Sequence, residues 1–243
     1  MSENNGVGIE MDLAKPQGAR RLPVYLLLDC SWSMNGEPIE AVQRGLEAFV
    51  REVKEDDFAG ETVHVGVITF GRVLEGGKDG ARLVTEGLIP IKEFAPPHLE
   101  ADGMTPLGDA FRELTKSIDR DVIPSVPGKP KGDWKPLVFI LTDGAPNDEW
   151  QDARQQVLDR ESKRLVNVIT IGCGRDIDRD TLREISLGDT YTLDEKNDTY
   201  FASFFAWMSS TVGSVANVLS SPGDDARRVD MPPAPPQVKQ LSF

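Results

Sequence analysis

"LPVYLLLDCSWSMNGEPIEAV", residues 22–42, begins as an apolar strand and ends as the first turns of a helix. A nearly continuous apolar run such as 22–28 is typical of a strand that is buried on both faces of a parallel sheet. Three side chains that carry oxygen, Asp29, Ser31 and Ser33, follow at alternate positions where this strand ends. The stretch therefore predicts a strand–loop–helix unit with a polar cluster at its tip.

The rest of the chain repeats this alternation of strand-like runs and helical patterns. Further strands are expected at 62–71, 81–89, 136–144, 166–174 and 190–195, and helices at 37–56, 105–119, 148–164, 178–186 and 200–221. The runs near 137–141 and 166–171 are as apolar as the first strand, which indicates a mostly parallel sheet covered by helices on both faces. The expected fold class is α/β and doubly wound, with about six strands, one of them antiparallel.

We expect one domain at 21–221, preceded by a disordered segment at 1–20 and followed by an extended, Pro-rich tail at 222–243. The segment 200–221 carries no charged residue, but its large apolar side chains form a single stripe. This pattern indicates an amphipathic helix that covers the sheet and does not span a membrane. We hypothesise that the tail packs over the small, uncharged face of this helix, which carries Ser203, Ala206, Ser210, Ser214 and Asn217.

Charge and cysteine content narrow the function. The net charge of −13 argues against nucleic acid or an anionic membrane as the main partner, because both attract basic surfaces. The two cysteines, Cys30 and Cys173, have no zinc-binding spacing and are expected to be buried thiols. The first residues lack the apolar core of a signal peptide, so a cytoplasmic location is expected.

Three polar elements are predicted to meet at one edge of the sheet. Asp29, Ser31 and Ser33 form the first, Thr105 in "DGMTPLG" the second, and Asp143 in "LTDG" the third. Doubly wound sheets bind ligands at the carboxyl ends of their strands. Two carboxylates and three hydroxyls are hard oxygen ligands, which suit Mg²⁺ or Mn²⁺ ahead of Ca²⁺. Each of these residues is also common in helix caps and turns, so a purely structural role stays open.

The three elements, in this order, resemble the von Willebrand factor type A domain and its metal-ion-dependent adhesion site. The segments "YLLLDCSWSMNGEPIEAV", "VGVITFG", "DGMTPLGDA" and "GDWKPLVFILTDGAPNDEW" look like the bacterial TerY-like branch of that family, which is associated with tellurium resistance and stress operons. The resemblance implies a Rossmann-like fold. It also implies that Ser31, Ser33 and Thr105 coordinate the metal directly, and that Asp29 and Asp143 act directly or through water.

The resemblance further implies a site that binds a protein partner, which supplies an acidic ligand to the metal. In the TerY-like branch this points to a scaffold in a phospho-signalling system, with a kinase or a PP2C-type phosphatase of the same operon as partner. Trp32 stands where the family usually has glycine. Its indole could cover the metal, contact the partner as an aromatic anchor, or fold back onto the neighbouring loop. Trp32 and Met104 are our candidate partner-binding residues.

The alternative function is a metal-dependent phosphatase or phosphotransferase that uses the strand-end aspartates. A phosphatase of the haloacid-dehalogenase type needs a second aspartate as general acid, and Ser31 stands at that position. The chain also lacks the GxxxxGK[ST] loop that binds phosphates. Adhesion at a cell surface is a third class that shares the family. We therefore predict a protein-interaction module and not an enzyme.

Overall fold

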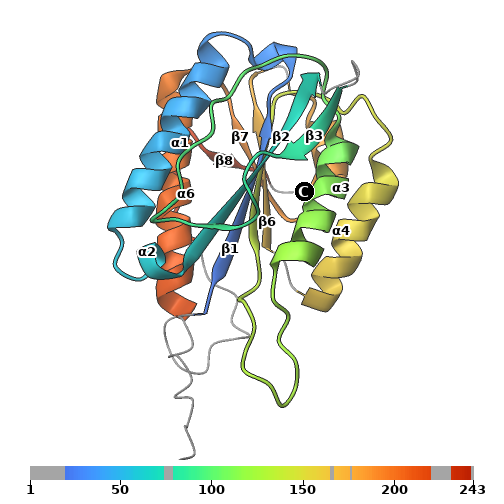
Figure 1. Ribbon diagram of the computed structural model, residues 1–243. Helices are drawn as coiled ribbons and strands as arrows, with labels where there is room; N and C mark the ends of the chain where they lie inside the picture. The colour runs from blue at the N-terminus through green and yellow to red at the C-terminus, as the bar shows by residue number, and fades with distance from the viewer. Residues whose placement is uncertain (1–19, 74–78, 165–166, 176, 220–230, 242–243) are drawn as a thin grey trace, which may run out of the picture.

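The computed structural model describes residues 20–73, 79–164, 167–175, 177–219 and 231–241, which form a helix-covered sheet (Figure 1). The strands are β1 Leu22–Asp29, β2 Val63–Val73, β3 Asp79–Leu83, β4 Ile89–Pro90, β5 Leu137–Thr142, β6 Asn167–Cys173, β7 Asp189–Leu193 and β8 Lys239–Gln240. The helices are α1 Glu37–Glu55, α2 Ala59–Thr62, α3 Leu107–Asp121, α4 Gln151–Arg164, α5 Arg179–Ile185 and α6 Asp198–Leu219, with a 3₁₀ turn, η1, at Trp32–Met34.

The described strands form one sheet in the order β3-β2-β1-β5-β6-β7-β8, with β4 also paired to β2. The pairs β2–β1, β1–β5, β5–β6 and β6–β7 are parallel. β3 and β4 pair antiparallel with β2, and β8 pairs antiparallel with β7. The doubly wound α/β fold is thus confirmed, with more strands than the six expected. The single strand expected at 81–89 is wrong: β3 ends at Leu83, and Gly87, with φ +83°, turns the chain before β4.

Helices cover both faces of the sheet. In Figure 1, α1 and α6 lie on one face and α3 and α4 on the other. Gly45 of α1 allows a close crossing, because a Cβ at this position would lie 2.0 Å from the Phe205 ring of α6. Cys30 and Cys173 are buried free thiols, as expected. No helix among the described residues is both long enough and apolar enough to cross a membrane.

The end of the Pro-rich tail joins the sheet. β8 pairs antiparallel with β7, Val238 is buried, and the indole of Trp207 in α6 donates to the carbonyl of Pro232 (2.9 Å). The hypothesis that the tail covers the small face of this helix needs correction, since Ala206 and Ser210 on that face are exposed. A large indole with an N–H donor gives the tail more to bind than small side chains do. The segments 1–19 and 222–230 lie outside the described residues.

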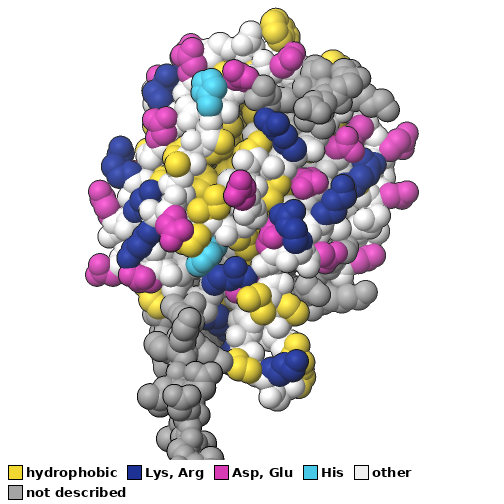
Figure 2. All heavy atoms as spheres, in the orientation of Figure 1, with side chains coloured by type: hydrophobic (Ala, Val, Ile, Leu, Met, Phe, Trp, Pro, Cys, Tyr) yellow, Lys and Arg dark blue, Asp and Glu magenta, His cyan; other side chains and the backbone are white. Residues whose placement is uncertain are grey.

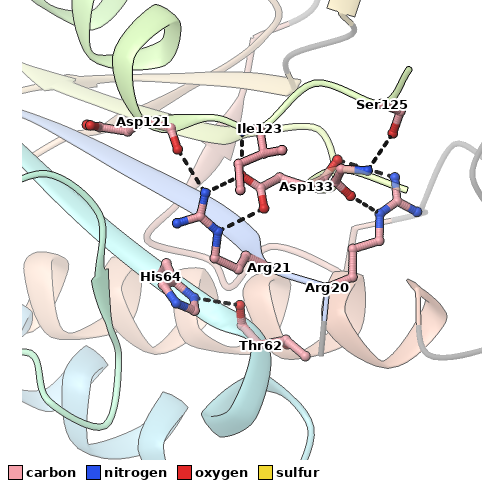
Figure 3. Close-up of polar contacts among 9 residues, drawn as sticks. Arg20, Arg21, Thr62, His64, Asp121, Ile123, Ser125 and Asp133 are labelled. Carbon is pink, nitrogen blue, oxygen red and sulfur yellow. Dashed lines mark hydrogen bonds and ion pairs between the residues drawn. The ribbon is translucent and has the colours of Figure 1, made fainter. Parts of the chain in front are cut away.

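An ion pair fastens the long loop before β5 to the amino end of β1 (Figure 3). The Arg21 guanidinium donates to both carboxylate oxygens of Asp133 (2.8 and 2.6 Å) and to the carbonyl of Asp121 (2.8 Å). Bidentate pairs of this kind are strong and directional. The amide of Trp134 also donates to the carbonyl of Arg21 (2.9 Å). These contacts hold the end of the sheet that lies opposite the predicted site.

The outer surface carries both signs of charge in spite of the net charge of −13. Figure 2 shows Asp and Glu side chains interspersed with Lys and Arg over the face in view. Among the described residues, several surface charges are paired, such as Arg44 with Asp198 (2.7 Å) and Arg112 with Asp109 (2.6 Å). This face therefore presents mixed charge and not a continuous basic surface.

Candidate metal centre

The two predicted carboxylate ligands lie at the topological switch point of the sheet. Asp29 is the last residue of β1, and Asp143 directly follows β5, its parallel neighbour. From β1 the chain continues to β2 on one side, and it later returns to β5 on the other side. The carboxyl edge between two such strands is where open α/β sheets bind ligands.

A chain of hydrogen bonds links the serines to the second aspartate. The hydroxyls of Ser31 and Ser33 are 3.0 Å apart, and the Ser33 hydroxyl donates to Asp143 Oδ1 (2.7 Å). Thr105 Oγ1 lies 3.3 Å from the position that a Cβ on Gly144 would take, which places it beside Asp143. The structure thus brings the five predicted ligands together. Ser33 is exposed, so solvent reaches the cluster.

Asp29 forms the buried base of the cluster. Its Oδ1 accepts from the amide of Ser31 (2.8 Å), and its Oδ2 accepts from the hydroxyl of Thr142 (2.7 Å). Burial, followed by the nearby charge of Asp143, raises the pKa of the Asp29 carboxyl to about 6, although the bonds from Ser31 and Thr142 oppose this rise. Both oxygens are engaged, so Asp29 positions the serine loop.

Helix capping does not explain the hydroxyls. The side chain of Ser31 makes no capping hydrogen bond to η1. The amides of Gly108 and Asp109, in the first turn of α3, donate instead to the carboxylate of Asp148 (2.9 Å each). The helix expected at 148–164 consequently begins later, at Gln151, because Asp148 is used to cap α3.

Two glycines that the sequence did not single out allow the site loops to meet. Gly71 and Gly103 have φ of +110° and +71°. A Cβ on Gly71 would lie 2.5 Å from the amide nitrogen of Ser31, and one on Gly103 would lie 2.2 Å from the carbonyl oxygen of Gly71. The amide of Trp32 donates to the carbonyl of Gly103 (2.9 Å). Close backbone contact of this kind requires glycine.

Two exposed apolar side chains belong to the loops that carry the hydroxyls. Trp32, between the two serines, is 65% exposed, and Met104, next to Thr105, is 56% exposed. The alternative in which the indole folds back onto the neighbouring loop is therefore wrong. Large apolar side chains that are exposed beside a polar site are typical of an interaction surface.

Lys196, in the loop between β7 and α6, is a site residue that the sequence did not reveal. Its Nζ donates to Asp143 Oδ2 (2.6 Å) and to the carbonyl of Ser33 (3.0 Å). The side chain of Asp143 is fully buried, whereas that of Lys196 is 30% exposed. A lysine in the segment "DEKND" gives no signal of this contact, because loop lysines are usually solvated.

The donor set fits a hard divalent cation. Among the described residues, no group of three or more His, Cys, Asp or Glu side chains could hold a metal. The cluster instead combines two carboxylates with hydroxyls, whose oxygens keep free lone pairs. Oxygen donors of this kind suit Mg²⁺ or Mn²⁺ and offer no nitrogen or sulfur to a softer metal.

A family comparison agrees with this architecture. The model of the von Willebrand factor type A domain matches residues 24–206, so the chain belongs to that family. Over 154 residues it is 25% identical to a von Willebrand factor A domain-containing protein of Dictyostelium discoideum, an alignment that covers 63% of this chain and 15% of the relative.

Two solved structures show the same fold. A von Willebrand factor type A protein from Catenulispora acidiphila has a TM-score of 0.58 and 17% identity, over 80% of this chain and 43% of that one. Proximal thread matrix protein 1 from the mussel byssus, with a zinc-occupied adhesion-site motif, has a TM-score of 0.52 and 16% identity, over 79% and 48%. The chain spans less than half of each relative. These matches do not distinguish the TerY-like branch, which stays a prediction.

Proposed function

We propose that this chain is a protein-interaction module whose strand-end cluster binds a partner through a divalent metal ion. The observation that carries the proposal is the hydrogen-bonded chain Ser31–Ser33–Asp143, beside Thr105 and above the buried Asp29. The zinc-occupied motif of the structurally similar mussel protein supports a metal at this edge of the fold.

Each residue of the cluster would have its own part in holding the ion. The hydroxyls of Ser31, Ser33 and Thr105 would hold Mg²⁺ or Mn²⁺ directly, and Asp29 and Asp143 would do so directly or through water. Asp29 would also fix the loop of Ser31, whose amide donates to its carboxylate. Two carboxylates do not over-neutralise a divalent ion. A bound ion would therefore still accept one more anionic oxygen as a ligand. A carboxylate from a protein partner is the ligand that fits.

Trp32 and Met104 supply the apolar part of the proposed interface. An exposed indole next to a charged contact has the character of a binding hot spot, because its large rigid surface is desolvated on binding while the polar contact fixes orientation. The metal would thus provide the charged contact and these two side chains the apolar one.

The narrower biological setting rests on the resemblance to the TerY-like branch. We place the module in the cytoplasm, as a scaffold of a bacterial stress response or tellurium-resistance system. A kinase or PP2C-type phosphatase of the same operon is then the proposed partner, with no nucleic acid or membrane involved. An interaction role is preferred over phosphoryl chemistry because Ser31 stands where a general acid would be needed, and a serine hydroxyl cannot serve as that acid at neutral pH.

A pull-down from lysate of the native organism, with Mg²⁺ or with EDTA, tests the proposal. We expect partners that are retained only with metal and that are lost with the double variant Ser31→Ala, Ser33→Ala. The matched control is Ser203→Ala with Ser210→Ala, which removes two hydroxyls from α6. Partners that ignore both EDTA and the double variant would contradict the proposal. Global unfolding of the double variant would favour a structural role for the cluster.

A further inference from the structure

Asp143 already binds a cation that belongs to the chain itself. One oxygen of its buried carboxylate accepts from the neutral hydroxyl of Ser33 (2.7 Å), and the other accepts from the ammonium of Lys196 (2.6 Å). The same ammonium donates to the carbonyl of Ser33 (3.0 Å). Lys196 therefore bridges two of the three polar elements at the position where the metal would need negative charge.

The lysine is supported in this position. Its stem lies against Gly174, where a Cβ would be 3.6 Å from Lys196 Cδ and 3.7 Å from Cε and Cγ. Gly174 itself is fixed in a turn, with φ +100° and its amide bonded to the carbonyl of Leu193 (2.8 Å). Packing along the stem lowers the rotamer freedom that an ordinary surface lysine keeps.

The acids nearest to Lys196 in sequence have other cations. Glu195 pairs with Arg175, and Asp194 pairs with Lys239. The ammonium of Lys196 is thus directed across to Asp143, on a different strand connection, and not to its own neighbours. The charge of Lys196 therefore lies within the candidate metal cluster.

We propose that Lys196 is a tethered cation that competes with the divalent metal for Asp143 and so sets the metal affinity of the site. The inference rests on the proposed metal function. With Lys196 in place, the two carboxylates and the ammonium carry one net negative charge, whereas two would attract the metal more strongly. The lysine also holds Asp143 and the serine loop together before a metal enters. A metal that binds must either displace the ammonium or share the carboxylate with it.

The test is a titration of the full chain with Mn²⁺, in which free Mn²⁺ is measured by electron paramagnetic resonance. Lys196→Met removes the charge and keeps the length of the stem. We expect it to raise the Mn²⁺ affinity on the order of tenfold relative to the wild type. Lys239→Met is the matched control: it removes the same charge from the neighbouring pair with Asp194 and should change the affinity by less than about twofold, because the solvent screens it.

The possible results test the role of Lys196 separately from the existence of the metal site. If the wild type binds Mn²⁺ and Lys196→Met binds it equally or more weakly, Lys196 does not compete with the metal. The proposed metal site would not be contradicted by that result. Equal gains in Lys196→Met and Lys239→Met would overturn the competition as well, since the effect would then be net charge alone. Absence of binding by both the wild type and Lys196→Met would overturn the metal site itself. Lys196→Gln, which keeps a donor to Asp143, replaces the methionine variant if that fails to fold.

Discussion

Asp29 gives the metal-free protein a pH dependence of its own. The folded-state pKa of its carboxyl is about 6, above the value of about 3.9 in an unfolded chain. The folded state therefore binds more protons between these values, and the contribution of Asp29 to stability falls as pH rises from about 4 to about 6. Ionised Asp29 thus opposes folding at neutral pH unless a metal compensates its charge.

In EDTA we expect Asp29→Asn to be more stable than the wild type at pH 7, by up to about 3 kcal/mol, and the difference to vanish near pH 4. The amide can still accept from the amide of Ser31, and it can donate to the hydroxyl of Thr142. Urea unfolding at the two pH values measures the difference. If the stability difference between the variant and the wild type is the same at both pH values, Asp29 does not titrate in this pH range.

Trp32 is the residue at which metal binding and partner binding should separate. We expect Trp32→Ala to weaken metal-dependent partner capture about 30-fold, as a hot-spot residue does, with Mn²⁺ affinity unchanged. Ile123→Ala is the matched control, because Ile123 is likewise exposed (56%) but lies in the loop before β5. Loss of Mn²⁺ affinity in Trp32→Ala would instead support the alternative in which the indole covers the metal.

At the residue scale the sequence predicted the five candidate ligands, which the structure brings together, but it did not predict the residues that support them. Asp29, Ser31, Ser33, Thr105 and Asp143 lie in local motifs whose place at strand ends follows from the apolar runs before them. Lys196 contacts Asp143 only because the fold brings the two residues together. The residues next to Lys196 in the sequence do not indicate this contact.

At the scale of elements, the crossing of α1 and α6 depends on one missing side chain. Alanine normally stabilises a helix over glycine by about 0.5–1 kcal/mol. At Gly45 the added Cβ would lie 2.0 Å from Phe205, whereas at Gly213 of α6 the nearest atom is 3.4 Å away, on Asp56. We expect Gly45→Ala to destabilise by about 1–3 kcal/mol and Gly213→Ala to be neutral or stabilising. Thermal unfolding of the two variants measures these changes in stability. A loss of stability in both variants, or a gain in both, would contradict the close packing of α1 against α6 at Gly45.

Periodicity predicted the long elements and not the short ones. β1, β5 and β6 consist mostly of buried apolar residues, and α1 and α6 carry clear apolar stripes, so each could be recognised from its own sequence. β4 and β8 are two residues long and exist only through pairing with β2 and β7. A strand defined by its partner leaves no pattern in its own sequence.

For the whole molecule, the tail protects one edge of the sheet. Truncation after residue 230 would remove β8 and expose the edge of β7 and the indole of Trp207. We expect faster hydrogen exchange in β7 and in the part of α6 around Trp207. Trp207→Phe, which keeps an aromatic ring and loses the donor to Pro232, should lower stability by only about 1 kcal/mol. Exchange that is unchanged by truncation would show that the tail adds nothing to the fold.

The two ends of the sheet carry different polar contacts. The ion pair between Arg21 and Asp133 stabilises the amino end, and hydroxyls and carboxylates cluster around Asp143 at the carboxyl end. The most direct test is an anomalous difference map from crystals soaked with Mn²⁺. We expect a peak beside the hydroxyls of Ser31 and Ser33, and we expect that peak to be lost in the Ser31→Ala, Ser33→Ala variant. A map without that peak at saturating Mn²⁺, or a peak that the double variant leaves unchanged, would contradict a metal site built from these residues.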